Sequence, residues 1–427
     1  MCCQNGLQLL GIKILGNFYF RKMSSPTWKT DVSFKEDLEK YVAQNLHRTE
    51  ISNIIEKDYP FYPSSVATLG RMLRHFGISY INRDTSAASV IDAVKQELNG
   101  TGKCLGYRAM NQKLRTKHNI KVPRHNVADI VQLLDPDGVE ERTVKHKKKR
   151  AKVPFVSNGP DWVWSLDGHD KMEGYQNWTF PLAIYGCQDT FSRKILFLEA
   201  WDTNSDPQII ASFYMKHLSQ TKKIPRYMRV DLGTENGLIG TIQSFLRRHH
   251  ADIADSTDTF LVGPSTSNKI ERFWRDLHER MEKAIKEILL RLLNNMQYDP
   301  HNELDRKLCL YVFLPVLQKE LDDFKEMWNC HRVRAQHGLQ LPCGVPNHMY
   351  RCPEEYGGEE MGMAVTEDEL VEVGVLANIE SAPNHYLTPE DIALFSTYLQ
   401  NPELLDVEDL EVAYLGLRKA VKTGGLS

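Results

Sequence analysis

The sequence predicts an α/β core built on a mixed five-stranded sheet with flanking helices, preceded by an all-α region and followed by a helical segment. Three observations predict this order. Residues 31–140 show helical spacing of apolar residues, 160–298 alternate strand-like with helix-like runs, and 299–352 return to a helical pattern. In the middle block, three strand-like runs joined by short turns precede a helix–strand–helix–strand–helix series. That order indicates antiparallel strands extended by parallel crossovers.

The composition indicates a globular protein with an uneven distribution of charge. With 427 residues, 41% of them hydrophobic, the chain is long and apolar enough for roughly two to four folded domains. The net charge is only −3, but residues 353–427 hold 16 Asp or Glu against 3 Lys or Arg, which leaves 40 acidic and 50 basic residues in 1–352. A basic body with an acidic end is typical of nucleic-acid-binding proteins.

Cysteine usage and hydropathy indicate where the protein works. The eight cysteines include no Cys-x-x-Cys pair, and no apolar run approaches the roughly 18 residues of a membrane span. We therefore expect reduced thiols in a nuclear or cytosolic protein and no membrane partner. Of the two locations, the nucleus is the one expected for a protein that binds nucleic acid.

The N-terminal part of the chain is predicted to be helical after a loose leader. Residues 1–30 lack periodicity, and two sets of three helices follow within 31–140. Helices are expected at 34–46, 49–57, 64–76, 87–98, 106–118 and 124–134. Thr49 is the expected N-cap of the second helix, Ser64 or Ser65 begins the third, and Pro123 suits a first turn.

Two three-helix units with basic third helices indicate tandem helix-turn-helix modules. Arg71 and Arg74 lie off the apolar stripe of the third helix and are candidate DNA contacts. A plain helical bundle with solvated basic faces is the alternative.

A basic linker is predicted at 141–159. Residues 142–152 hold seven Lys or Arg and no acid. The side chains of Lys147, Lys148, Lys149 and Arg150 are candidates to follow DNA phosphates or to act as a nuclear-import signal. A solvated tether fits the same composition.

The block 160–298 carries the sheet. Strands are expected at 162–166, 182–187, 195–200, 227–230 and 259–262, and helices at 207–221, 238–249 and 269–293. A helical extension at 299–352 contains one long helix at 303–334, which Pro315 allows to kink. The acidic tail at 353–427 is expected to be a solvated or regulatory end, with two helices within 388–422.

Three acidic residues stand in positions that suit a catalytic site. Asp167 lies inside an apolar strand, where an acid costs several kcal/mol unless it is paired or bound to metal. Asp231 ends a strand and precedes Gly233, a place where open α/β sheets present functional groups. Glu271 opens a long amphipathic helix. Carboxylates in this arrangement form the usual ligand set of a two-metal phosphoryl-transfer site.

Glu271 has a structural alternative, because Asn268 and Glu271 have the spacing of a capping box. Three neighbouring residues, Lys269, Arg275 and His278, favour the functional interpretation, since cations beside a metal-binding carboxylate can hold DNA phosphates.

Other polar and aromatic residues near these carboxylates are expected to be structural. Asp170 and Asp189 are expected in turns, and Trp162 and Trp164 in the core. His169 lies two residues beyond Asp167 in the same alternating run.

Four blocks of the sequence, at 165–171, 188–193, 230–236 and 263–274, together resemble the integrase core of DDE recombinases. The likeness is greatest to animal integrase-core proteins related to Ginger-type transposases and retroelement integrases. It covers roughly residues 90–350, including the segment from Trp328 to Arg334 that precedes Pro342 and Pro346. Two departures are evident: the upstream region shows no His-His-Cys-Cys zinc module, and the acidic end does not resemble a basic SH3-like domain.

The resemblance implies an RNase H-like fold in which Asp167, Asp231 and Glu271 form the acidic triad, spaced by 64 and 40 residues. It implies a metal-dependent polynucleotidyl transferase that uses Mg²⁺ (or Mn²⁺), acts on DNA as a homo-multimer and integrates DNA, with no small-molecule substrate. Two alternatives stay open. One is a domesticated, transposon-derived DNA-binding protein without strand transfer; the other is a hydrolytic nuclease acting on RNA–DNA hybrids.

Overall fold

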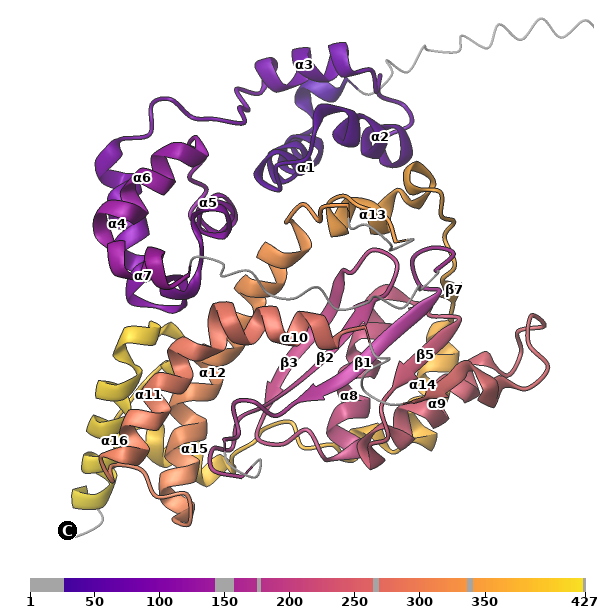
Figure 1. Cartoon of the computed structure of the whole chain (residues 1–427). Coiled ribbons are helices and arrows are strands. Elements are labelled where there is room, and N and C mark those ends of the chain that lie inside the picture. Colours follow the sequence, from indigo (N-terminus) through magenta and orange to yellow (C-terminus); the bar gives the residue numbers. More distant parts are fainter. Residues whose placement is uncertain (1–26, 143–156, 175–177, 264–268, 336–340, 425–427) are drawn as a thin grey trace, which may run out of the picture.

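The computed structural model describes residues 27–142, 157–174, 178–263, 269–335 and 341–424. Most of the expected leader and most of the basic linker therefore lie outside the described residues. Figure 1 shows a helical region made by the first third of the chain and a sheet covered by helices.

A mixed five-stranded sheet forms the centre of the molecule, as the sequence predicted. Its strands are β1 Val163–His169, β2 Ala183–Asp189, β3 Ile195–Trp201, β5 Tyr227–Val230 and β6 Phe260–Val262. The strand order is β3-β2-β1-β5-β6. The β1–β2 and β2–β3 pairs are antiparallel, whereas β1–β5 and β5–β6 are parallel. Short turns thus connect the first three strands, and helical crossovers bring in the last two.

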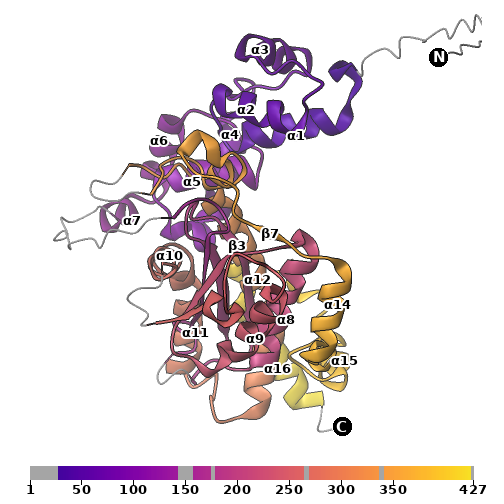
Figure 2. The same cartoon turned by 90° about the vertical axis from the view of Figure 1, so that its right-hand side faces the viewer.

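Helices cover both faces of the sheet (Figures 1 and 2). One face packs on α8 Pro207–Thr221 and α9 Gly237–Arg247, and the other on α10 Glu271–Leu277, α11 Lys283–Asn294 and α12 Glu303–Asn329. Because side chains alternate along a strand, Trp164 and Leu166 of β1 enter the core under α8 and α9. Asp167 and His169 consequently face α10.

The helix expected at 269–293 is wrong as a single α-helix. A π-helical turn, His278–Glu282, separates α10 from α11. Such turns occur often at functional sites. By contrast, α12 continues through Pro315 as one helix.

The N-terminal helices follow the expected order. They are α1 Val32–Ala43, α2 Arg48–Asp58, α3 Val66–His75, α4 Ala87–Asn99, α5 Tyr107–Thr116, α6 Arg124–Leu134 and α7 Pro136–Glu141. Two helix starts differ from expectation. His47, not Thr49, is the N-cap of α2, and its backbone N–H donates to Glu50 at 2.6 Å. Pro123 is the N-cap of α6 and not a first-turn residue, whereas Ser65 caps α3 as expected.

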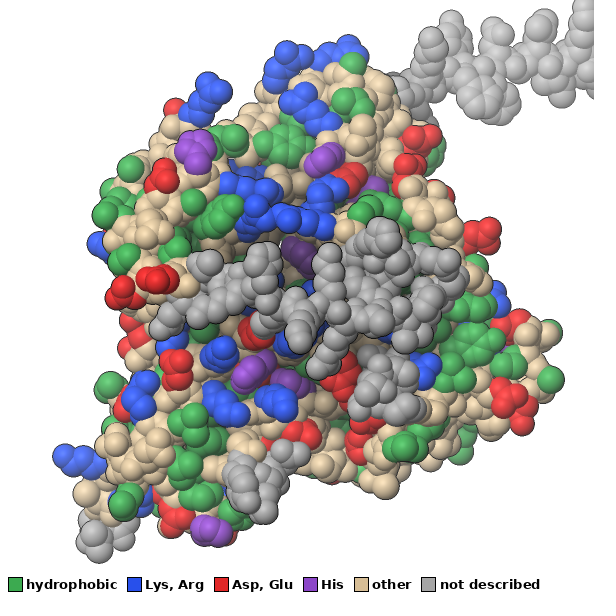
Figure 3. All heavy atoms as spheres, viewed as in Figure 1, with side chains coloured by type: hydrophobic (Ala, Val, Ile, Leu, Met, Phe, Trp, Pro, Cys, Tyr) green, Lys and Arg blue, Asp and Glu red, His purple; other side chains and the backbone are tan. Residues whose placement is uncertain are grey.

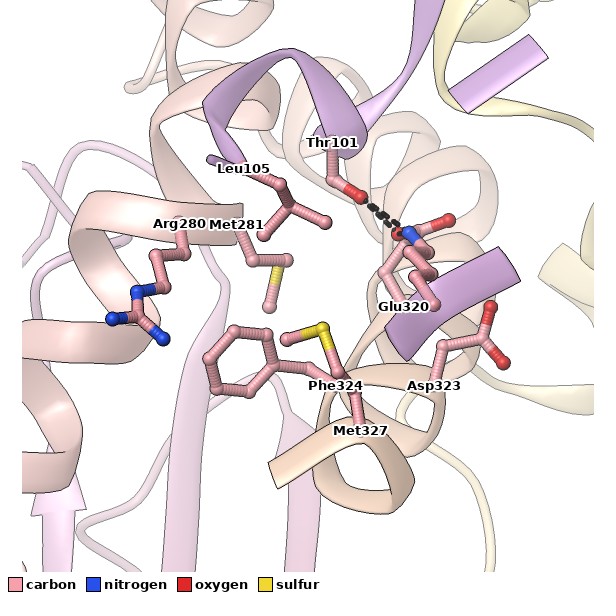
Figure 4. Close-up of a pocket in the computed structure, with 9 residues that line it drawn as sticks. Thr101, Leu105, Arg280, Met281, Glu320, Asp323, Phe324 and Met327 are labelled. Atoms are coloured by element: carbon pink, nitrogen blue, oxygen red, sulfur yellow. Dashed lines mark hydrogen bonds and ion pairs between the residues drawn. The ribbon is translucent and has the colours of Figure 1, made fainter. Parts of the chain in front are cut away.

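The second helical unit is attached to the core by a buried cluster of charges. Lys113 Nζ of α5 lies 2.8 Å from Glu97 of α4 and 3.2 Å from Glu320 of α12. Thr101 donates to the same Glu320 carboxylate, as Figure 4 shows. All four side chains are buried. Since a buried charge is stable only beside its partner, this cluster fixes the unit on α12.

The first helical unit has a core of its own, in which Phe34, Leu38 and Ile51 are fully buried. Val345 and Cys352, at the two ends of α13 Pro346–Arg351, complete this core. The unit therefore docks on the segment that follows α12.

The acidic C-terminal part is packed against the core over residues 353–424, so the expectation of a solvated end is wrong for this range. The two-residue strand β7 Met363–Ala364 pairs with β4 Lys223–Ile224. Three further helices follow: α14 Glu367–Leu376, α15 Pro389–Ser396 and α16 Leu410–Gly424. Figure 2 shows α14 and α15 on the side of the molecule away from α10.

Ion pairs join this acidic part to basic residues of the core. Glu360 pairs with Lys223, Glu367 with Lys222, and Glu372 with Arg248. Short 3-10 helices lie at Trp28–Thr30, Thr101–Cys104, Thr234–Asn236, Ser256–Thr259, Pro353–Tyr356, Ile379–Ser381, Pro402–Leu404 and Val407–Asp409. Among the residues described, no helix is both long and apolar enough to cross a membrane.

We expect Lys113→Met to lower the free energy of unfolding by about 3 kcal/mol, because it removes the buried cation between Glu97 and Glu320 and leaves them only the more exposed Lys117, 3.3 and 3.8 Å away, and His118 beside Glu97. Urea denaturation measures the change. The matched control is Lys35→Met, which removes an exposed ion pair with Glu39 and should cost at most about 0.5 kcal/mol. Equal losses in the two variants would contradict the assigned role of the cluster.

Candidate active site

Asp167 is a buried carboxylate in the middle of the sheet. It lies on β1 opposite Gly186 of β2, and its residue is only 4% exposed. The indole N–H of Trp274, on α10, donates to Asp167 Oδ2 at 2.9 Å. A Cβ atom on Gly186 would come within 2.8 Å of the Trp274 ring. Glycine at this position therefore leaves the space in which the indole reaches the carboxylate.

Asp231 follows the end of β5, the strand that runs parallel to β1. The two strands are in register at Ser165 and Arg229, and two further steps along each strand lead to Asp167 and Asp231. The two acids thus lie side by side on neighbouring interior strands, level with the C-terminal end of β5. Asn236 donates to Asp231 Oδ1 at 3.3 Å and accepts from the Tyr185 hydroxyl at 2.6 Å.

Glu271 is the exposed first residue of α10. The N-cap of this helix is Ile270, which is fully buried and makes no side-chain cap hydrogen bond. A capping box needs its Glu at the third helical position, so the structure does not support that alternative for Glu271. Asn268 lies outside the described residues. The backbone N–H of Lys269 donates to Ser165 on β1 at 3.4 Å, which holds the helix start against the sheet.

The three acids influence one another electrostatically. Burial raises the pKa of Asp167 to about 8, and the charges of Glu271 and Asp231 add to this although the Trp274 hydrogen bond lowers it. Burial also raises the pKa of Glu271; there His169 acts in the opposite direction, and Asp231 raises it further. The site therefore groups acidic side chains in a partly dry place, where a bound cation would favour their ionised forms.

The three carboxylates do not form a closed metal cage in this conformation. Within the described ranges, no group of three or more His, Cys, Asp or Glu side chains is arranged to hold a metal ion. The fold brings Asp167 and Asp231 together on the neighbouring strands β1 and β5, and it places Glu271 at the start of α10.

A hydrogen-bonded network behind Asp167 was not expected from the sequence. His169 stacks on Trp274 with 4.7 Å between ring centroids and 12° between ring planes. Its Nε2 lies 3.1 Å from Glu282 Oε2, and Nδ1 of His278 lies 2.9 Å from the same oxygen. The position of His169 on the face of Asp167 was a usable signal, but its partner Glu282 is 113 residues away in the sequence and carried no such signal.

The basic residues expected beside the acids have different environments. Arg275 is exposed on α10, while Lys269 and His278 are partly buried. Burial lowers the pKa of Lys269, as does the charge of Arg229. One ring nitrogen of His278 is taken up by Glu282. Arg275 is thus the most accessible of the three cations.

The other expected DNA contacts lie away from the acids or cannot be placed. Arg71 and Arg74 are exposed on α3. Figure 3 shows Lys and Arg side chains over α3 and again over α10 and α11. Lys147, Lys148, Lys149 and Arg150 lie outside the described residues.

The residues expected to be structural have structural environments. Asp189 is buried and accepts from the backbone N–H and the hydroxyl of Ser192 in the β2–β3 turn. Asp170 accepts from Asn204. Trp164 is fully buried, and Trp162 packs edge-on against Tyr227.

We expect Asp167→Asn to stabilise the metal-free protein, and to do so more at pH 8.5 than at pH 5. The pKa of Asp167 is raised to about 8 in the folded protein, so folding becomes less favourable as the pH rises from about 4 to about 8. Asn removes this penalty, worth about 1.4 kcal/mol for each pKa unit. Thermal unfolding in a chelator at the two pH values measures it. Asp258→Asn, at an exposed site, should show no such difference; an equal gain at both pH values for Asp167→Asn would contradict the assignment.

Comparison with known proteins agrees with the geometry. A search of curated proteins finds no match. Residues 155–349 match the family model described as the integrase core domain, a span that contains all three acids and the whole sheet. The closer relation to Ginger-type transposases stays a prediction. The match supports an integrase-type catalytic core over residues 155–349, and the mixed sheet with its flanking helices is consistent with an RNase H-like integrase core.

Proposed function

We propose that this chain is a DDE-type polynucleotidyl transferase that cleaves DNA and transfers strands with the help of divalent metal ions. The observation that supports the proposal is the position of Asp167 and Asp231 side by side on β1 and after β5, with Glu271 at the start of α10, within the span that matches an integrase core domain. Integrase core domains generally use divalent metal and act on DNA.

The three acids suit Mg²⁺ or Mn²⁺ in their chemistry. Carboxylate oxygens are the ligands that these hard cations prefer. The raised pKa values of Asp167 and Glu271 reflect burial and mutual repulsion, which a cation would relieve. In this proposal the exposed Glu271 side chain turns toward the two aspartates when metal and DNA bind.

In reactions of this class, bound divalent ions activate a water or a 3′-hydroxyl and stabilise the leaving 3′-oxygen during in-line displacement at phosphorus. Asp167 and Asp231 would hold such ions from the sheet, and Glu271 would add a third carboxylate from the start of α10. Because no covalent enzyme intermediate is required, the chain needs no nucleophilic side chain.

Basic residues in two regions are proposed to bind the DNA backbone. Lys269 and Arg275 lie at the start of α10 and on its exposed face, and His278 would contact phosphate through its other ring nitrogen. The two helical units are proposed as helix-turn-helix modules, with Arg71 and Arg74 of α3 as contacts.

The basic run that includes Lys147, Lys148, Lys149 and Arg150 is proposed to follow phosphates or to direct nuclear import. Assembly as a homo-multimer on DNA and a nuclear location belong to the same proposal.

A second candidate function is a domesticated DNA-binding protein that no longer transfers strands. One observation favours it: the three acids do not form a ready metal cage in the part of the chain that the structure describes. The two functions differ in turnover, not in DNA binding.

We expect the purified protein to join blunt or nicked DNA ends when Mn²⁺ is present. We expect Asp231→Asn to reduce joining to the background level. The exposed Asp258→Asn variant should retain wild-type joining. Gel analysis of labelled DNA separates the alternatives. Joined products support the transferase, cleavage of RNA–DNA hybrids without joining supports a nuclease, and DNA retention without turnover supports the binding protein.

We expect Arg275→Ala to weaken DNA binding about equally for all sequences and to reduce the slope of log K against log salt by about 0.9, since one phosphate contact is lost. Fluorescence anisotropy over a salt series measures this slope. Lys419→Ala on α16, another exposed cation, is the control and should leave the slope unchanged. A sequence-selective loss for Arg275→Ala would indicate a base contact instead.

A further inference from the structure

We infer that Trp274, held in place by His169 and Glu282, is a positioning residue that fixes Asp167 so that one carboxylate oxygen stays available to metal. This inference rests on the proposed function, because it assigns Trp274 a role in that same site. The observation behind it is a continuous path of contacts from the π-helical turn to the buried aspartate.

The first step of the path is the bond between Trp274 and Asp167. An indole N–H can only donate, so it selects an oxygen that accepts. It contacts Oδ2 at 2.9 Å, and both residues are nearly fully buried. Rotation of the carboxylate would break the bond where no water is available to replace it. Asp167 is thereby held in one orientation, with Oδ1 left for another ligand.

The second step fixes the indole itself. His169 covers one face of the Trp274 ring in a stacked arrangement, and the edge of the ring fills the space above Gly186. A histidine over a tryptophan face gains from cation–π attraction when it is charged. The indole cannot tilt without losing contact with both neighbours.

The third step fixes His169. Glu282 is fully buried, and hydrogen bonds from His169 and His278 lower its pKa although burial opposes this. His278 and Glu282 lie four residues apart within the π-helical turn, and the Glu282 carboxylate contacts two imidazoles, those of His278 and His169. A buried anion shared by two histidines gives His169 a fixed position.

This arrangement resembles the support that metal-binding carboxylates commonly receive. Ligating side chains are usually oriented by hydrogen bonds from residues that do not touch the metal, and loss of such a bond typically costs about 10–100-fold in metal affinity. Trp274 has this relation to Asp167.

The test is the Mn²⁺ affinity of the full-length protein, measured by electron paramagnetic resonance of free Mn²⁺ without DNA. The component lost in Asp231→Asn defines binding at the proposed site. We expect Trp274→Phe, which keeps the ring but removes the N–H, to weaken this component about 10-fold or more. The matched control is Trp164→Phe, which removes a 2.8 Å indole bond to the buried Asp161 on the other face of the sheet and should leave the affinity unchanged.

A second variant separates positioning from simple electrostatics. A cationic His169 would repel a metal ion at the neighbouring acids, so by electrostatics alone its replacement with a neutral side chain should strengthen cation binding. If His169 positions Trp274, however, His169→Gln should weaken Mn²⁺ binding. Thermal unfolding verifies that each variant is folded, and if Trp274→Phe does not fold, His169→Gln decides the question.

The outcomes are distinct. Weaker Mn²⁺ binding in Trp274→Phe and His169→Gln, but not in Trp164→Phe, supports the inference. Unchanged affinity in folded Trp274→Phe, an equal loss in Trp164→Phe, or tighter binding in His169→Gln overturns it while leaving the proposed function standing. Failure of wild-type protein to show any binding that depends on Asp231 overturns the proposed function and this inference together.

Discussion

The burial of Asp167 in the central strand is the constraint on which the site depends. A carboxylate in that position is unfavourable unless its surroundings compensate for lost water. The compensation comes from a distant helix: Trp274 donates to it, Gly186 leaves room for the ring, and His169 supports the ring from the other side. The sheet, α10 and the π-helical turn are thus joined through one acidic side chain, so the local geometry of each is coupled to the others.

Two buried clusters of charged residues, one around Glu97 and the other around Asp167, differ in whether cationic side chains of the chain accompany the acids. In the cluster that docks the second helical unit, hydrogen bonds from His118 and the charge of Lys113 outweigh burial and lower the pKa of Glu97 to about 2. Asp167, in the central strand, is about as buried as Glu97 but has acids for neighbours. Its pKa is raised to about 8. The first cluster is complete within the polypeptide. The second has an excess of negative charge that an external cation would balance, and this contrast is the physical basis for assigning structure to one and chemistry to the other.

Alternation and helical periodicity predicted most of the elements, because each buries one face on a single core. The strands at 195–200 and 227–230 and the helix at 207–221 illustrate this. The positions of Asp167, Asp231 and Glu271 followed from their strand and helix ends. Interactions set by tertiary packing were not predictable in the same way. In the sequence, Trp274 is indistinguishable from the other apolar residues of its helix stripe. The contact of Glu282 with His169 joins residues 113 positions apart. The pairing of β4 with β7 involves two residues from each segment, too few to leave a periodic pattern.

The attachment of the C-terminal part to the core has a consequence for biosynthesis. Lys223 and its partner Glu360 are 137 residues apart, and Leu370 and Val373 of α14 fill the same apolar cluster as Trp164. A ribosome delivers the sheet well before it delivers α14. During that interval the apolar surface under α14 is open to water and to other chains, a situation that favours aggregation of nascent multidomain proteins. The apolar cluster on this face of the sheet is therefore completed only after α14 has emerged.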